Sequence, residues 1–148
     1  MSTDQIARNK EIYHRFHGAT DSGDLDHIDR VIDELVAPDV DFHAPLPMGT
    51  TATDALKLVW RTLIQAFPDI RVTVEDVIAE GQKVVARQTV TGTHRGEYRG
   101  HAPTGRSVRY NEIFILRFED GRIAEIWGVV DVLTQLKQLG LVADHQTV

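Results

Sequence analysis

Asp131 is the first candidate for acid–base chemistry, because it stands between two apolar pairs, Val129-Val130 and Val132-Leu133. Such surroundings are poorly hydrated, which favours the protonated acid and could raise the pKa of the carboxyl from about 4 towards the ~6–7 that suits a general base. An aspartate directly before a helix is also an ordinary N-cap, whose carboxylate accepts hydrogen bonds from free backbone N–H groups. The sequence leaves both roles open.

Three histidines are candidate partners for this carboxyl. His43 ends a predicted strand, and His94 and His101 lie in a glycine-rich loop. A histidine in such a place could donate a proton to a carbonyl oxygen or hold the carboxylate in position. Each is equally compatible with a surface or structural role. His14 and His17 lie three apart on a predicted helix, but no carboxylate completes a ligand set, so we predict solvated side chains and no metal site.

Glu112 is a rival carboxylate on the strand that pairs with the one before Asp131. Strand alternation places Tyr110, Glu112 and Phe114 on one face of the sheet. Which face looks inward depends on the hairpin register at Asp120-Gly121, and a slip of one residue reverses it. If Glu112 faces inward it is a second candidate base; otherwise it is a surface charge.

The glycines of the central region do not form a phosphate-binding motif. Gly92, Gly96, Gly100 and Gly105 lie between strands rather than before a helix, so no phosphate loop or dinucleotide fingerprint is present. The sequence also lacks a His-Glu-x-x-His zinc motif and a serine elbow. It therefore predicts an acid–base reaction without a cofactor, or ligand binding alone.

Composition indicates one globular domain over residues 1–148. A chain of 148 residues buries roughly 70% of its unfolded surface, which is enough for a core and a pocket. The net charge of −6 does not favour nucleic acid or an anionic membrane as partner. The absence of cysteine excludes disulfides and thiolate metal sites.

The polar N-terminus leads directly into an amphipathic pattern, so no signal peptide is predicted. No apolar run approaches the ~20 residues that a membrane span requires. We therefore expect a cytoplasmic protein.

The elements that must position these residues can be predicted from periodicity and turn signals. β-branched runs predict strands over residues 39–43, 70–79, 84–93, 107–118 and 122–130, and Asp-Gly between the last two predicts a tight hairpin. Apolar spacing and caps predict helices from Ser2 to Gly18, from Asp24 to Pro38, from Thr53 to Pro68 and from Val132 to Gly140. Residues 143–148 are expected to fray.

Two loops are candidate borders of a pocket. The segment Ala44-Pro45-Leu46-Pro47-Met48-Gly49 cannot be helix or central strand, so it is either a pocket lip beside His43 or a rigid connector. The loop over residues 94–106 either covers the mouth of the cavity and moves, or is an ordered hairpin loop packed on a neighbouring subunit.

The central region resembles a known family. The matching residues are Thr91-Gly92-Thr93-His94-Arg95-Gly96-Glu97, Pro103-Thr104-Gly105-Arg106, Phe118-Glu119-Asp120-Gly121-Arg122-Ile123, Trp127 and Asp131. They resemble the SnoaL-like polyketide cyclase (ester cyclase) family of the nuclear transport factor 2-like superfamily, from the first helix to Gly140. The resemblance implies an α+β cone, in which N-terminal helices cover a strongly curved antiparallel sheet and leave an apolar cavity. Helices that precede a meander without βαβ alternation also indicate an α+β fold.

The resemblance also bears on the site. Cyclases of this family pair a pocket aspartate, which aligns with Asp131, with a histidine that cannot be assigned to one position here. Family members often carry a histidine before the tryptophan and a polar residue after it. Ile126 and Gly128 stand at these positions, which makes the pocket more apolar.

We therefore expect a cofactor-independent enzyme that removes a proton next to a carbonyl of a small hydrophobic molecule, as in the aldol cyclisation of polyketides. Asp131 would be the base, and a histidine or Tyr13 would stabilise the enolate oxygen. The predicted substrate-binding residues are Tyr13, Phe16, Trp60, Glu112, Phe114 and Trp127. The alternatives are a non-catalytic binding module and a related cofactor-free hydroxylase, isomerase or hydrolase. An Asp131 that lines an open cavity favours the enzyme, and one that only caps a helix favours binding.

The outer face of the predicted sheet suggests self-association. In residues 84–130, β-branched side chains occupy both odd and even strand positions, so they lie on both faces of the sheet, while helices can cover only one face. The uncovered face would be a large apolar patch on a monomer, so we predict a homodimer through it. The family also commonly dimerises.

Overall fold

The computed structural model describes residues 2–43 and 48–143. Its elements follow in the order α1 (Thr3–Thr20), α2 (Leu25–Leu35), β1 (Val36–Phe42), α3 (Ala52–Ala66), β2 (Arg71–Glu80), β3 (Lys83–Thr93), β4 (Ser107–Glu119), β5 (Arg122–Val130) and α4 (Val132–Gln138). Most of the proline-rich segment (44–47) and most of the tail (144–148) lie outside the described residues, so the expectations for them stay predictions. No helix in the described ranges is long and apolar enough to cross a membrane.

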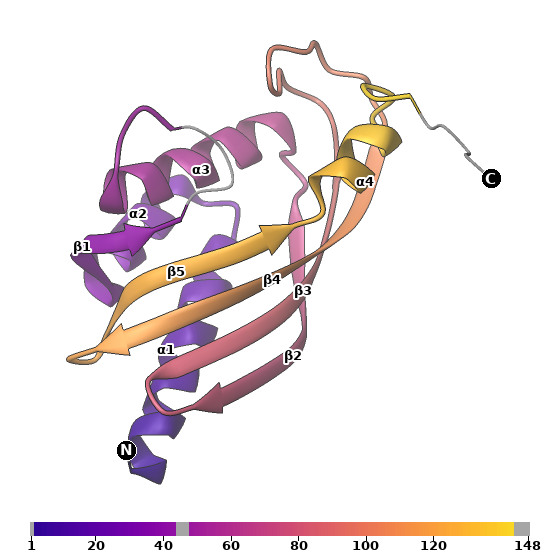
Figure 1. The fold of residues 1–148 in the computed structure, drawn as a ribbon. Helices are drawn as coiled ribbons and strands as arrows, with labels where there is room; N and C mark the ends of the chain where they lie inside the picture. The colour runs from indigo at the N-terminus through magenta and orange to yellow at the C-terminus, as the bar shows by residue number, and fades with distance from the viewer. Residues whose placement is uncertain (1, 44–47, 144–148) are drawn as a thin grey trace.

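The fold is α+β, as predicted, with α1, α2 and α3 on one face of a curved five-stranded sheet (Figure 1). Ile28 and Ile32 of α2 and Leu56 of α3 form a buried cluster with Leu116 and Phe118 of β4. Burial of these amphipathic helix faces against the concave side of the sheet supplies the main favourable term in folding.

The sheet has the strand order β1-β5-β4-β3-β2. Strands β2 to β5 are antiparallel neighbours, as predicted, but β1 runs parallel to β5, so the sheet is mixed rather than wholly antiparallel. Strand β1 begins at Val36, three residues before the predicted start, and therefore includes Pro38. The residue before a proline avoids the helical region, which ends α2 early, and an edge strand tolerates the missing N–H.

Helix caps were predicted correctly at two of three N-terminal helices. The side chains of Ser2 and Asp24 accept hydrogen bonds from the backbone N–H groups of Gln5 and His27. The predicted Thr53 cap of α3 is wrong, because the helix already begins at Ala52 and its cap position is Thr51. Thr51 and Thr53 carry the same hydroxyl group, so the sequence does not distinguish between them, and the Thr51 side chain makes no capping hydrogen bond.

The hairpin between β4 and β5 sets the side-chain parity of both strands. Asp120 and Gly121 have φ angles of 52° and 75°, the conformation that a two-residue turn of this type requires. In the resulting register Glu112 pairs with Val130 and with Gln88 of β3. Glu112 therefore faces the helices, whereas Ile113 is 45% exposed on the outer face of the sheet.

The loop between β3 and β4 is packed against the end of α3. The backbone N–H groups of Arg95 and Gly96 donate to the Ala66 carbonyl at 2.9 and 3.1 Å. A Cβ atom at Gly96 would overlap the Gln65 carbonyl oxygen, so this contact requires glycine. Tyr98 is buried in the core beneath the loop. The loop is therefore anchored at its base, and its motion stays a prediction.

Candidate active site

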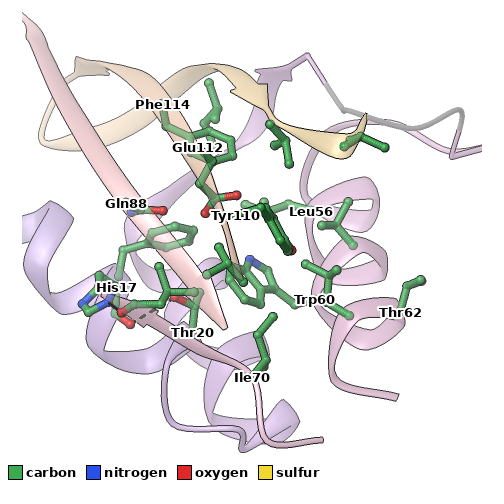
Figure 2. A pocket seen from close by; sticks show the side chains of 18 of the residues that line it. His17, Thr20, Leu56, Trp60, Thr62, Ile70, Gln88, Tyr110, Glu112 and Phe114 are labelled. Atoms are coloured by element: carbon green, nitrogen blue, oxygen red, sulfur yellow. Dashed lines mark hydrogen bonds between the residues drawn. The ribbon is translucent and has the colours of Figure 1, made fainter. Parts of the chain in front are cut away.

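A cavity of about 100 Å³ lies between α1, α3 and the concave face of the sheet. It has room for several waters or a small organic group, since one water needs roughly 10–15 Å³ by such a measure. Its wall is mainly apolar, and the polar or charged side chains that matter below are Tyr13, His17, Gln88, Arg99, Tyr110 and Glu112. Figure 2 shows the Glu112 carboxyl pointing into this space from β4, between Gln88 and Tyr110.

Glu112 is the carboxylic acid of the cavity. Among the described residues, no side chain or backbone group donates a hydrogen bond to its carboxyl. Burial among apolar side chains raises the pKa of Glu112 to about 7. A carboxyl in this state is ionised in part near neutral pH and accepts a proton readily, which is the property of a general base.

Two phenols lie beside this carboxyl. The Gln88 amide donates a hydrogen bond to the phenol oxygen of Tyr13, which leaves the Tyr13 O–H free to donate elsewhere. Burial raises the pKa of Tyr13 to about 12, and burial together with the nearby Glu112 charge raises the pKa of Tyr110 further. Both phenols therefore stay protonated at neutral pH and are hydrogen-bond donors to any oxygen in the cavity.

The floor of the cavity near α4 is held by a second polar pair. The Tyr98 hydroxyl donates to the Gln135 side-chain oxygen at 3.1 Å, and both residues are buried. Gln135 also lines the cavity, next to Tyr110. This bond fixes α4 and the β3–β4 loop against the same wall.

Asp131 lies outside the cavity, although Val130 and Val132 on either side line it. Its carboxylate caps α4 and accepts hydrogen bonds from the Thr134 backbone N–H at 3.1 Å and the Thr134 hydroxyl at 2.6 Å. Bonds from Thr134 hold the pKa of Asp131 below its usual value. The predicted desolvated, high-pKa Asp131 is therefore wrong, because apolar neighbours in sequence turn away from it in space.

His43 and Trp127, predicted near the cavity, lie on the outer face of the sheet. Their rings stack with centroids 5.4 Å apart, and Lys83 lies over the Trp127 ring. His43 Nε2 is 2.9 Å from a carboxylate oxygen of Glu125. Trp127 stands at a position of β5 whose side chain points to the outer face, whereas Ile126 and Val130 point into the cavity. The placement of Trp127 in the pocket is thus corrected by the hairpin register.

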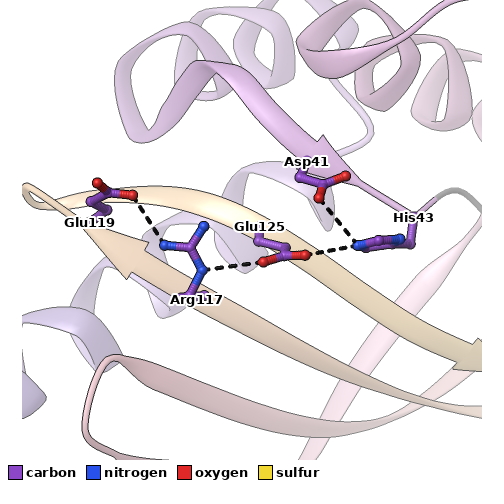
Figure 3. A network of polar contacts seen from close by, with 5 residues as sticks. All are labelled: Asp41, His43, Arg117, Glu119 and Glu125. Carbon is purple, nitrogen blue, oxygen red and sulfur yellow. Dashed lines mark hydrogen bonds and ion pairs between the residues drawn. The ribbon is translucent and has the colours of Figure 1, made fainter.

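A cluster of ionisable groups surrounds His43 (Figure 3). Asp41, His43 and Glu125 are, in the described part of the chain, the one group that offers three ligand atoms within 4.8 Å of one another. Both oxygens of Glu125 already have partners, since Arg117 binds the second one at 3.2 Å. Arg117 and His43 therefore already satisfy both oxygens of Glu125, so this cluster gives no argument for a bound metal ion.

The other two predicted histidines also lie away from the cavity wall. His94 is fully buried, and its Nδ1 accepts the Thr104 backbone N–H at 3.1 Å, which places the proton on Nε2. That Nε2 has no hydrogen-bond partner within the described ranges. His101 is exposed in a turn that its backbone forms with Tyr98. Neither histidine reaches Glu112.

His17 lines the cavity and is not the solvated surface residue that the sequence predicts. Its Nε2 is 2.6 Å from the Val72 carbonyl oxygen, so it donates a hydrogen bond to β2. Its ring stacks on Tyr13 at 6.4 Å. The signal that could have found it is its spacing of four residues from Tyr13, which puts both on one helix face.

The remaining predicted pocket residues do line the cavity, namely Tyr13, Phe16, Trp60, Glu112 and Phe114. Phe114 lies there because residue 128 is glycine: a Cβ atom at Gly128 would overlap the Phe114 ring. Any larger residue at this position would displace that ring. A role of these five residues in substrate binding stays a prediction.

Known proteins share the sequence pattern and the fold of this chain. A family model described as SnoaL-like polyketide cyclase matches residues 10–139. IdmH from Streptomyces antibioticus, a proposed polyketide cyclase, is 34% identical with a TM-score of 0.75, over 89% of this chain and 98% of that chain. AclR from Streptomyces galilaeus, a proposed hydroxylase, is 30% identical with a TM-score of 0.81, over 94% and 89%. No functionally curated protein gives a significant match.

Proposed function

We propose, from the premise that this chain belongs to the SnoaL-like polyketide cyclase family, that it removes a proton next to a carbonyl of a small apolar molecule. Glu112 is the base. The single observation that supports this most is its carboxyl, which points into an apolar cavity with no donor bound to it among the described residues. A carboxylate that must abstract a carbon-bound proton has to be ionised, poorly hydrated and open to the ligand.

The reaction proceeds by proton transfer and charge stabilisation. The Glu112 carboxylate takes the proton, and the electron pair of the broken C–H bond moves to the carbonyl oxygen, which becomes an enolate. The O–H groups of Tyr13 and Tyr110 donate to that oxygen, because both phenols stay protonated. Donors placed where charge develops in a dry site are often the largest catalytic term.

The second half of an aldol cyclisation returns the proton. The enolate carbon attacks another carbonyl of the same molecule, forming a C–C bond and an alkoxide. The Glu112 carboxylic acid then protonates the alkoxide and is restored to its carboxylate. Every group in this sequence belongs to the chain or the substrate, so the proposed reaction needs no cofactor.

A second candidate is a binding module without turnover. It is favoured by Asp131, the residue aligned with the family's aspartate, which caps α4 outside the cavity. The likeness to AclR, a proposed hydroxylase, points to a third candidate: the enolate carbon formed by Glu112 adds dioxygen, and the proton held by Glu112 completes a hydroperoxide. The first and third candidates share the proton abstraction, so one experiment separates both from binding alone.

The experiment measures exchange of the α-protons of 2-tetralone, an apolar ketone, for deuterium in D₂O by proton NMR. Wild type should accelerate exchange over buffer, and Glu112→Gln should lose about 10²–10⁴-fold of that rate while it stays folded. Asp131→Asn is the matched control, because it removes a carboxylate outside the cavity and Asn caps about as well as Asp. Equal rates for wild type and Glu112→Gln would refute Glu112 as the base, and no acceleration by wild type would favour the binding module.

A further inference from the structure

Arg99 lies at the mouth of the cavity, where it is exposed to solvent and also contributes to the lining. It is the one arginine or lysine among the described residues that line the cavity. Its charge acts on the Tyr110 phenol inside, as does the charge of Glu112. The cavity therefore has a potential base in its interior and a cation at its entrance.

The backbone at Arg99 is held in a conformation that arginine rarely adopts. The backbone groups of Tyr98 and His101 exchange two hydrogen bonds, of 3.0 and 2.9 Å, which closes a tight turn over Arg99 and Gly100. Arg99 has a φ of 51° and Gly100 a φ of 79°. Glycine or asparagine is the usual residue at such a φ, and strained positions of this kind gather at functional sites.

Among the residues that the structure describes, no carboxylate pairs with the guanidinium of Arg99. It lies 5.4 Å from the centroid of the Tyr98 ring, whose hydroxyl is fixed by Gln135. Within the described ranges no acidic group pairs with it, in contrast to four other arginines that each face a carboxylate, Arg15, Arg61, Arg71 and Arg117. Tyr98 thus positions a cation whose N–H donors are left for another molecule.

We propose that Arg99 binds a carboxylate of the ligand, so that the substrate is an apolar carbonyl compound with a carboxylate at the end nearest the mouth. The planar fork of arginine matches a carboxylate with two parallel hydrogen bonds. A single cation suits a group of charge −1 better than a phosphate monoester, since no second lysine or arginine lines the described cavity wall. Arg99 is a specificity residue, and the assignment of its ligand as the substrate rests on the proposed function.

The test compares two ligands of nearly the same shape, 2-naphthoate and its neutral amide 2-naphthamide. Their dissociation constants are measured by NMR titration at pH 6, where the Glu112 carboxyl is mainly uncharged. Wild type should bind naphthoate on the order of tenfold more tightly than the amide, the usual worth of a charge-assisted hydrogen bond. Arg99→Gln should bind both ligands about equally.

Two further variants exclude loss of fold and general charge effects. Arg99→Gly removes the side chain and suits the positive φ, so it should melt no lower than wild type and still lose the preference. Arg95→Gln removes the same charge from an exposed position of the same loop that does not line the cavity, and should keep the preference. Equal affinities in wild type, binding of neither ligand, or a preference that survives Arg99→Gln would each overturn the proposal.

The outcome is independent of the test of Glu112. Exchange of 2-tetralone, which has no carboxylate, requires the base and not Arg99. The naphthoate preference requires Arg99 and should persist in Glu112→Gln. A protein that accelerates exchange but shows no preference would overturn the role of Arg99 alone, and the opposite result would overturn the proposed reaction alone.

Discussion

Glu112 on β4 and Asp131, the first residue after β5, start from neighbouring backbone positions, yet only the Glu112 carboxyl enters the cavity. Glu112 pairs with Val130, and the next backbone N–H, that of Asp131, donates to the Asn111 carbonyl at 3.1 Å. Glu112 projects to the concave face, whereas Asp131 turns into the first turn of α4. The same chemical group therefore has a raised pKa at one position and a lowered pKa at the other.

Glu112 should make the protein less stable as the pH rises. Its pKa in the folded state is about 7, against an ordinary 4.5, so between these values the folded state keeps a proton that the unfolded state has lost. The contribution of Glu112 to the free energy of unfolding should be largest below about pH 4.5. It should fall by about 3 kcal/mol as the pH rises to about 7. Urea unfolding at pH 5 and pH 8 measures this.

Glu112→Gln should remove that dependence and be more stable than wild type at pH 8. The variant should unfold at the same urea concentration as wild type near pH 5, after correction for other groups common to both. Asp131→Asn is the control, and its effect on stability should have the opposite pH dependence. The pKa of Asp131 is lowered in the folded state, so this residue contributes stability that is lost as the pH falls. If Glu112→Gln were less stable than wild type at pH 8, the prediction would be wrong, because the Glu112 carboxylate would then have a stabilising partner in the folded protein.

The rate of proton abstraction should rise with pH through the pKa of Glu112, about 7. Above that pH the rate should level off, with no fall up to about pH 9, because the pKa of Tyr13 is raised to about 12 and the phenols stay protonated. The exchange rate of 2-tetralone is measured from pH 5 to 9. A bell-shaped profile that falls below pH 9 would contradict the assignment of the two phenols as the donors.

Tyr13→Phe should slow exchange by roughly 10–100-fold, because it keeps the ring and removes a donor to the enolate oxygen. It also leaves the Gln88 amide without its partner, which should destabilise the fold by about 1 kcal/mol. Tyr98→Phe is the matched control: it breaks one buried hydrogen bond to Gln135 and should show a similar loss of stability with a smaller loss of rate. Equal rate losses in the two variants would assign the Tyr13 effect to structure.

The outer face of the sheet should bind a second copy of the chain. Ile78, Ile113 and Val129 are 60%, 45% and 77% exposed there, and an apolar surface of this kind favours association. Wild type should sediment as a dimer at micromolar concentration, and Val129→Lys should shift it to the monomer of 16.6 kDa. Leu133→Lys, on α4 with 56% exposure, should leave the dimer intact. A monomeric wild type would refute the prediction.

Amide exchange should divide the β3–β4 loop into a slow base and a fast tip. The N–H groups of Arg95 and Gly96 are bonded to Ala66 and should exchange slowly, whereas the exposed Arg99–Gly100 turn should exchange fast. Naphthoate should slow the tip alone if Arg99 binds it. Uniform slow exchange across residues 96–105, with and without ligand, would exclude a gating role for the loop.

Local sequence signals were sufficient for most of the fold. The β-branched runs, the Asp120-Gly121 hairpin and the caps Ser2 and Asp24 depend on interactions within a few residues, so they can be predicted from the chain alone. The parallel pairing of β1 with β5 could not be predicted, because it joins segments about 85 residues apart in sequence and leaves no local mark. The resemblance to the family was likewise carried by short motifs, and the family model confirms it.

The sequence by itself determined that Tyr110, Glu112 and Phe114 share a face, since alternation is a property of any strand. Only the tertiary structure decided that this face is the inner one, and that the cavity wall includes His17 and Arg99. The reason is that hydration, and with it the pKa of a carboxyl, depends on which surfaces close over it in space. Apolar neighbours along the chain surround Asp131 in sequence, but apolar neighbours from α1, α3 and the sheet surround Glu112 in the folded protein.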